Sequence, residues 1–230
     1  MINNKLVKSG TYLFLASMVG NVSAYFFQFY MSRKLSVEDF GMLNSLLSLS
    51  AIVSVPAGTV SLVMARYVSK FNALQNIGKI KYLFLNAYVK LLIAGGVGFG
   101  IFIFLSAYIG NFLNVSARLP IILIGISLLL SLILPINMGL LQGLQRFRYL
   151  GIIGILSGVL RLAFGVLLIY IGLGINGAIL AGIITVFVIT LITCYPMRFL
   201  FDKTIEYDKE RYTKEVLWYS LPTTLAALSF

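Results

Sequence analysis

The sequence predicts an all-α integral membrane protein. Of its 230 residues, 60% are hydrophobic and only 11% are charged, whereas a soluble domain carries roughly 25% charged residues. The mean hydropathy is +0.97. Apolar runs reach the length of about 20 residues that a helix needs to cross a bilayer, and long strands of alternating polarity are absent from the sequence. These features favour a bundle of membrane helices over a soluble domain or a barrel.

Six apolar segments are expected to form membrane helices. The first continues to about residue 32 without a clean cleavage site, so we interpret it as a retained helix and not as a secretory signal. Ser36 is suited to cap the second helix, Pro56 predicts a kink within it, and Pro120 suits the first turn of the fourth. The expected helices cover residues 9–32, 40–65, 82–108, 120–142, 149–171 and 178–199.

The last part of the chain differs in composition. Residues 200–215 carry charges of both signs and are expected to form a cytoplasmic amphipathic linker. Residues 216–230 begin another hydrophobic helix, which is shorter than the span of about 20 residues that a bilayer requires. We therefore expect residues 1–199 to form one six-helix lobe and residues 216–230 to be the truncated start of a second lobe.

Lysine and arginine are unevenly shared between the two sides that these helices define. One side would carry Lys5, Lys8, Arg66, Lys70, Lys79, Lys81, Arg146, Arg148, Arg198, Lys203, Lys209, Arg211 and Lys214. The other would carry Arg33, Lys34 and Arg118. Because short cytoplasmic loops are enriched in Lys and Arg, we expect a cytoplasmic N-terminus in the inner (cytoplasmic) membrane. The net charge of +11 thus reflects membrane orientation and not nucleic-acid binding.

Two basic residues lie inside the expected spans, Lys90 in the third and Arg161 in the fifth. Gly154, Gly158 and Gly165 share the helical face of Arg161, and small residues let another helix approach closely. Because an ionisable residue inside the membrane marks a functional site by default, Arg161 is predicted to contact an anion; alternatively it caps carbonyl groups of a broken helix. Lys90 is predicted to be a second anion contact, or else to reach the headgroups with its long side chain.

The acidic residues sharpen this prediction. All seven lie at positions 38–39 or from 202 onward, so the spans between them hold no carboxylate to pair with either cation. An unpaired buried cation is costly unless an anion or water reaches it, and a cavity of this charge attracts phosphate groups. Polar residues on the first three helices are predicted to line that cavity, namely Asn21, Gln28, Asn44 and Asn86.

Enzyme chemistry fits this sequence poorly. The chain contains no histidine and a single cysteine, Cys194, so no histidine metal site, histidine base or intrachain disulfide is expected. General acid–base catalysis most often uses His, Glu or Asp, and here the acids stand outside the central spans. We expect no catalytic residue, metal or cofactor. A glycan polymerase or glycosyltransferase and a purely structural membrane scaffold stay as alternatives.

Three stretches carry a family resemblance: FYMSRKLSVEDFGMLNSLLSL at 29–49, VMARYVSKF at 63–71, and GLLQGLQRFRYLGIIGILSGVLRLAFGVLLIYIGLGINGAIL at 139–180. The third is the most specific, with a glutamine turn, a basic pair, a charged fifth helix and a GLGINGA turn in that order. The chain resembles the polysaccharide-transport branch, the O-antigen flippases, of the multidrug/oligosaccharidyl-lipid/polysaccharide exporter superfamily. WYSLPTTLAALSF at 218–230 looks like the start of that family's second half.

The resemblance implies the N-terminal lobe of a two-lobe exporter with six helices per lobe. Such proteins move undecaprenyl-pyrophosphate-linked oligosaccharides across the membrane by alternating access during surface polysaccharide and lipopolysaccharide synthesis, and other polysaccharide assembly proteins are expected partners. Basic cavity residues would engage the pyrophosphate, and Arg161 matches the family's basic residue in helix five by position. The alternatives are a drug or cation antiporter, which usually needs a carboxylate in this lobe, and a lipid II exporter, which shares the charge pattern.

Overall fold

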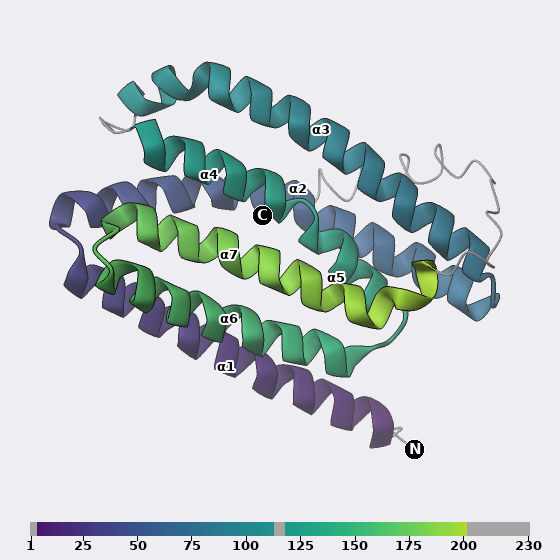
Figure 1. Ribbon diagram of the computed structural model, residues 1–230. Coiled ribbons are helices and arrows are strands. Elements are labelled where there is room, and N and C mark those ends of the chain that lie inside the picture. The colour runs from purple at the N-terminus through teal and green to yellow at the C-terminus, as the bar shows by residue number, and fades with distance from the viewer. Residues whose placement is uncertain (1–3, 113–117, 202–230) are drawn as a thin grey trace.

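The computed structural model describes residues 4–112 and 118–201, which are helical throughout apart from short turns (Figure 1). The predicted all-α fold is confirmed for this part of the chain. The linker and second-lobe predictions fall almost entirely on residues 202–230, outside the described residues. The elements are α1 (Asn4–Lys34), α2 (Val37–Ala73), α3 (Ile77–Phe112), α4 (Arg118–Ser131), α5 (Leu134–Gly143), α6 (Phe147–Tyr170), α7 (Gly174–Cys194) and the 3₁₀ helix η1 (Tyr195–Phe201).

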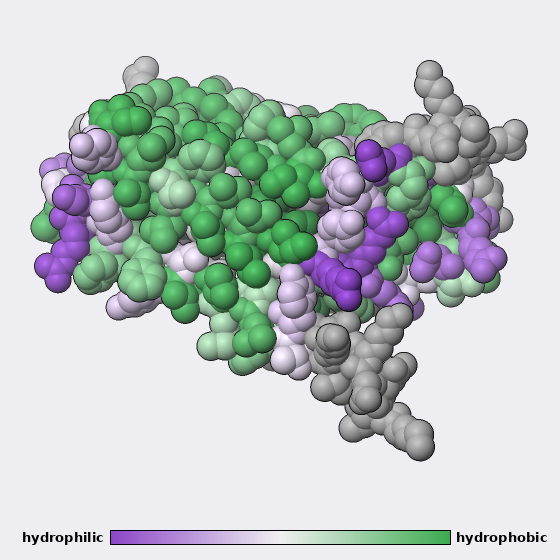
Figure 2. Space-filling view, turned by 60° about the horizontal axis from the view of Figure 1, so that its bottom comes forward, coloured by the Kyte–Doolittle hydropathy of each residue, from purple (hydrophilic) through white to green (hydrophobic). Residues whose placement is uncertain are grey.

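The helices run back and forth between two ends of one bundle (Figure 1). One end holds the turns at 74–76 and 144–146 together with η1, and we call it the basic end because Lys and Arg gather near it: Arg66, Lys70, Lys79, Lys81, Arg146, Arg148 and Arg198. The opposite end, called the distal end, holds the turns at 35–36 and 171–173. Figure 2 shows a broad apolar band between hydrophilic residues at the two ends, as expected for a membrane bundle.

Four segments of the described chain are long and apolar enough to cross a membrane, namely Ile77–Ser106, Leu119–Gly143, Phe147–Tyr170 and Gly174–Leu200. They correspond to the third to sixth expected spans. The helices of the first two expected spans, α1 and α2, contain 31 and 37 residues. These two helices are less apolar because they carry more Ser, Asn and Gln, which suits helices that face a polar cavity or another part of a protein.

The basic stretch at 65–81, which separates the second and third expected helices, predicts a loop there. This prediction is wrong, because α2 continues to Ala73 and α3 begins at Ile77. Only residues 74–76 separate the two helices. Long basic side chains are compatible with helix ends that emerge from the apolar band, so the charge run did not require an irregular loop. The predicted cap is confirmed: the Ser36 hydroxyl accepts a hydrogen bond from the Asp39 N–H at 3.1 Å. The backbone of α2 stays helical across Pro56.

The turns at 74–76 and 144–146 have the same construction. Gln75 and Gln145 each follow a leucine and adopt positive φ angles of 52° and 56°. The next residue then closes a hydrogen bond to a carbonyl five residues earlier, at 3.0 Å from the Asn76 N–H to Phe71 and at 2.9 Å from the Arg146 N–H to Leu141. This is the Schellman pattern that ends helices. The same local arrangement therefore joins α2 to α3 and α5 to α6.

The expected fourth helix, residues 120–142, is divided in the structure. Helix α4 ends at Ser131 and α5 begins at Leu134, with Pro135 in the first turn of α5. Proline has no N–H to donate and its ring clashes with the preceding turn, so the helical ladder is interrupted here. Residues 132–133 bridge the gap with hydrogen bonds to the third preceding carbonyl, from the Leu132 N–H to Leu129 at 3.3 Å and from the Ile133 N–H to Leu130 at 3.2 Å.

A buried polar network holds α5 in place beyond this break. Asn137 is fully buried; its amide nitrogen donates to the Thr193 hydroxyl at 2.7 Å, and its oxygen accepts from the Tyr88 hydroxyl at 3.0 Å. The Thr193 hydroxyl in turn donates to the Thr190 carbonyl at 2.7 Å. The network therefore links α3, α5 and α7 across the apolar interior.

Replacing Asn137 with leucine is expected to lower stability by about 1–2 kcal/mol, because two interhelical hydrogen bonds of roughly 0.6 kcal/mol each are lost and the Thr193 and Tyr88 hydroxyls lose their Asn137 partner. Thermal unfolding of the purified protein in detergent measures the loss. Asn72→Leu, at an exposed position near the end of α2, is the matched control. Equal unfolding temperatures for the two variants would show that the network does not stabilise the bundle.

Candidate functional site

A cavity of about 520 Å³ lies in the middle of the bundle, bounded by α1, α2, α4, α6 and α7. Two apolar clusters flank it along the bundle axis: one near the basic end includes Phe71 and Leu140, and one near the distal end includes Phe27 and Ile179. Its polar lining consists of Arg161, one amide and five hydroxyl groups, from Asn21, Ser17, Ser50, Ser127, Ser157 and Thr185. Among the residues that the structure describes, no Asp or Glu belongs to this lining.

Arg161 projects from the middle of α6 into the cavity wall. The central carbon of its guanidinium lies 4.7 Å from the centre of the Phe27 ring on α1. Its Nε is buried and has no hydrogen-bond partner among the residues that the structure describes. The guanidinium also makes no hydrogen bond to a backbone carbonyl within these residues, so the alternative role as a cap of a broken helix has no support there. The cation is compensated by a ring face in place of a carboxylate.

Glycines position α6 directly against α1. A Cβ atom on Gly158 would lie 2.9 Å from the carbonyl oxygen of Gly20, and one on Gly20 would lie 3.1 Å from the carbonyl oxygen of Gly154. Farther along, a Cβ on Gly165 would lie 2.6 Å from the Phe27 ring. Side chains at these positions would push the two helices apart. The predicted close approach on the glycine face is confirmed, and α1 is the approaching helix.

Of the four amides predicted to line the cavity, Asn21 does so. Gln28 and Asn44 do not belong to the lining. The Gln28 amide nitrogen donates to the Asn44 oxygen at 2.7 Å, and the Asn44 nitrogen donates to the Phe40 carbonyl at 2.8 Å. This pair ties α1 to α2 about one helical turn beyond the lining residues Ala24 and Leu47, on the distal side of the cavity.

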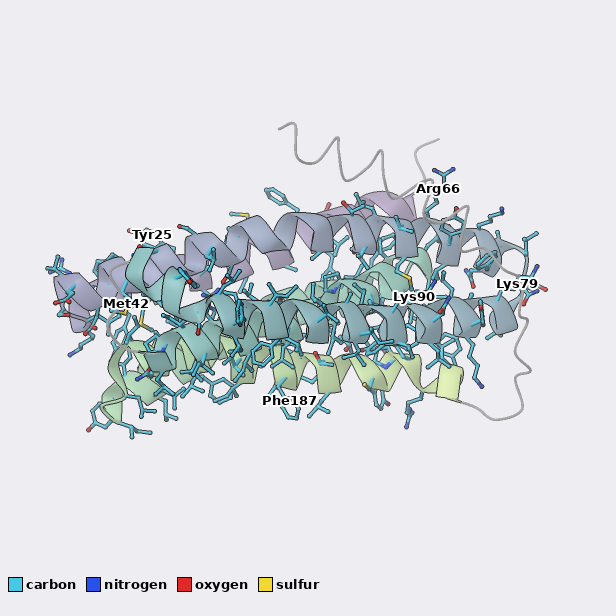
Figure 3. The ribbon with its side chains drawn as sticks, turned by 90° about the horizontal axis from the view of Figure 1, so that it is seen from above. Tyr25, Met42, Arg66, Lys79, Lys90 and Phe187 are labelled. Carbon is cyan, nitrogen blue, oxygen red and sulfur yellow. The ribbon has the colours of Figure 1, made fainter. Side chains whose placement is uncertain are left out.

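Lys90 lies apart from Arg161. It is exposed on α3, in the half of the bundle that holds Lys79 and Arg66 (Figure 3). Ala94 and Gly98, which follow Lys90 along the same face, line a separate apolar pocket of about 210 Å³ between α3 and α4. Asn86, half-buried on α3, is likewise absent from the lining of the Arg161 cavity. The structure therefore does not bring the two predicted cations together, and a binding role for Lys90 stays a prediction.

Sequence reasoning missed Phe27 and the hydroxyls of Ser50, Ser127, Ser157 and Thr185. The serines and the threonine lie in apolar helices, where small polar side chains often hydrogen-bond to backbone carbonyls of their own helix. Thr185, for example, donates to the Ala181 carbonyl at 2.7 Å. Phe27 is one of 17 phenylalanines, and nothing local distinguishes it. Within residues 4–112 and 118–201, no group of three or more His, Cys, Asp or Glu residues is placed to hold a metal ion.

Comparison with known proteins places this geometry in a family. The profile described as "Polysaccharide biosynthesis protein" matches residues 6–230. An uncharacterized membrane protein of Methanocaldococcus jannaschii is 25% identical over 249 residues, which cover 98% of this chain and 56% of that protein. The chain thus spans about half the length of this relative.

Solved structures share the fold at low sequence identity. A MATE transporter in the straight conformation superposes with a TM-score of 0.76 at 16% identity, over 97% of this chain and 52% of that one. An outward-facing multidrug resistance MATE family transporter of the MOP superfamily also gives 0.76 at 16% identity, over 96% and 53%. These likenesses show that the described helices have the fold of one half of a MATE protein. The profile match over nearly its whole length shows that this multi-pass membrane chain belongs to the polysaccharide biosynthesis protein family.

Proposed function

We propose that the protein is a flippase-type transporter, which moves a polyprenyl-pyrophosphate-linked oligosaccharide from the cytoplasmic to the outer leaflet for surface polysaccharide synthesis. In this proposal the chain contributes one lobe of a two-lobe exporter that works by alternating access. The observation that carries the proposal is Arg161: a cation with a buried, unpartnered Nε in the wall of a cavity lined, among the described residues, without carboxylates.

The chemistry of a pyrophosphate headgroup suits this cavity. Guanidinium groups bind phosphate oxygens through planar, charge-assisted hydrogen bonds. Asn21 can donate to the remaining phosphate oxygens. Four of the five lining hydroxyls, those of Ser17, Ser50, Ser157 and Thr185, donate to carbonyls of their own helices, so their oxygens can accept hydrogen bonds from sugar hydroxyls. A volume of about 520 Å³ falls within the range of roughly 300–1,000 Å³ that is usual for ligand pockets, while the polyprenyl chain would remain in the surrounding bilayer.

Membrane orientation is part of the same proposal. The basic end gathers more Lys and Arg than the distal end, where Arg33 and Lys34 lie on the last turn of α1. Because cytoplasmic ends of membrane helices are enriched in basic residues, the basic end faces the cytoplasm and the distal end faces outward, in the inner membrane. Proteins that assemble the polysaccharide would be the partners.

A drug or cation antiporter is the second candidate, and the fold likeness to a multidrug resistance MATE transporter favours it. The cavity itself does not, since its charged lining residue is a cation and would repel a cationic drug. A lipid II exporter would use the same charge pattern as the first candidate. The candidates differ in whether Arg161 should strengthen the binding of an anionic lipid or weaken the binding of a cationic drug.

The test measures ligand binding to full-length protein in lipid nanodiscs. Arg161→Gln is expected to weaken binding of undecaprenyl pyrophosphate at least tenfold, because a charge-assisted hydrogen bond contributes about 1.5–3 kcal/mol. Lys90→Gln, which removes a cation outside the cavity, is expected to have the smaller effect. Unchanged binding in Arg161→Gln, with tight and Arg161-independent binding of ethidium, would refute the flippase proposal and favour the antiporter.

A further inference from the structure

The Phe27 ring is the partner of the Arg161 guanidinium among the described residues. We propose that Phe27 is a positioning residue, which orients Arg161 and leaves its hydrogen-bond donors free to bind an anion. The inference deepens the proposed function and rests on it. It is based on how the ring stabilises the positive charge of Arg161, in a cavity whose described lining holds no carboxylate.

An aromatic face and a carboxylate stabilise a buried guanidinium in different ways. A carboxylate would occupy two N–H donors and cancel the charge, so that a phosphate would have to displace it. The negative face of a ring attracts the cation without engaging those donors in conventional hydrogen bonds. With the ring centre 4.7 Å from the guanidinium carbon, Arg161 keeps both its charge and its hydrogen-bond donors available to the cavity.

The ring is held in a fixed place. Phe27 is only 2% exposed and its neighbour Met31 is fully buried. A Cβ on Gly165, one turn after Arg161, would lie 2.6 Å from Cε2 of Phe27 and 2.8 Å from Cε of Met31. The absence of a side chain at Gly165 therefore makes the room in which the ring packs against α6. Gly165 thus fixes the position of the Phe27 ring, and the ring in turn fixes the position of the Arg161 guanidinium.

The chain offers an internal control for this contact. Arg33 and Phe29 form a similar pair on α1, with the guanidinium carbon 5.4 Å from the ring centre. Both residues are exposed near the distal end, and neither lines the cavity. Removing the Phe29 ring changes an arginine–phenylalanine contact of the same chemistry on the same helix, away from the candidate site.

The experiment measures the dissociation constant of farnesyl pyrophosphate for full-length protein in nanodiscs. Phe27→Leu and the unbranched Phe27→Met are expected to weaken binding about tenfold, since a desolvated cation–π contact contributes on that scale. Phe27→Tyr, which keeps the ring face, and Phe29→Leu are expected to bind within about twofold of the unmodified protein. Size-exclusion profiles identify any variant that fails to fold.

The outcomes separate the inference from the proposed function. If Phe27→Met and Phe27→Leu bind like the unmodified protein while Arg161→Gln loses binding, the positioning role is refuted and the anion site stands. If folded Phe27→Tyr binds as weakly as Phe27→Met, the ring face is not the cause and the inference is also refuted. If Arg161→Gln binds farnesyl pyrophosphate as well as the unmodified protein, the proposed function itself fails.

Discussion

Replacing Ser157 with glutamate is expected to weaken anion binding in the cavity strongly while Arg161 stays in place. Ser157 and Arg161 both line the cavity, and they stand four residues apart on α6, the spacing at which glutamate and a following cation pair on one helical face. Two opposite unit charges about 4 Å apart attract by roughly 4 kcal/mol at an effective dielectric constant near 20. The new carboxylate would engage Arg161 and repel the phosphate.

The expected loss of lipid-pyrophosphate affinity is about a hundredfold, or roughly 2.7 kcal/mol. Titration of Ser157→Glu in nanodiscs measures it. Ser157→Gln is the matched control, because its side chain has almost the same size without the charge, and it should bind within about threefold of the unmodified protein. Comparable affinities for the glutamate and glutamine variants would show that the anion does not bind beside Arg161.

Replacing Gly139 with alanine is expected to cause the largest loss of stability of any single methyl group added to the bundle. A Cβ at this position on α5 would lie 2.5 Å from the Ser61 carbonyl oxygen and 2.6 Å from the Met64 Cβ on α2. Both obstacles belong to or adjoin the backbone, so no side-chain rotation relieves them. Gly143, one turn later, meets Val68 and the Ala65 carbonyl at similar distances, and the two glycines therefore set how closely α2 and α5 pack.

Overpacking of this kind costs about 1–3 kcal/mol, which thermal unfolding in detergent would register as a clear drop in the unfolding temperature of Gly139→Ala. Gly96→Ala is the control, because no described residue lies within 4 Å of the Cβ position at Gly96. Alanine in that open helical site should instead stabilise by about 0.5–1 kcal/mol. A Gly139→Ala protein as stable as Gly96→Ala would mean that α2 and α5 are not in direct backbone contact.

The fold was largely predictable because its determinants are local in the chain. Apolar runs of bilayer length mark the spans, and Ser36 caps α2 as its residue type predicts. Errors arose at helix ends. The charges between 65 and 81 suggested a loop, yet basic side chains extend along helix termini, and the turn needed only residues 74–76. The division between α4 and α5 follows from Pro135, whose effect on a continuous apolar run depends on what packs around it.

The candidate site was predictable in part. Arg161 was identified because an intramembrane cation on a glycine face is rare and costly, and the glycines do meet α1. Gln28 and Asn44 illustrate the limit: both are polar residues on membrane helices, but a hydrogen bond of 2.7 Å joins them to each other. A polar side chain on a membrane helix can form a hydrogen bond to a neighbouring helix or can face a cavity. The sequence of its own helix does not show which of the two occurs.

The sequence by itself determined the membrane class, the order of the helices, the carboxylate-free spans and the arginine that stands among them. Tertiary structure decided which helices meet. It therefore separated Lys90 from Arg161, brought Tyr88, Asn137 and Thr193 into one hydrogen-bonded network and placed Phe27 against the Arg161 guanidinium. The physical reason is that hydropathy and helical periodicity act within one segment, whereas these contacts depend on shape complementarity between faces that are far apart in the chain.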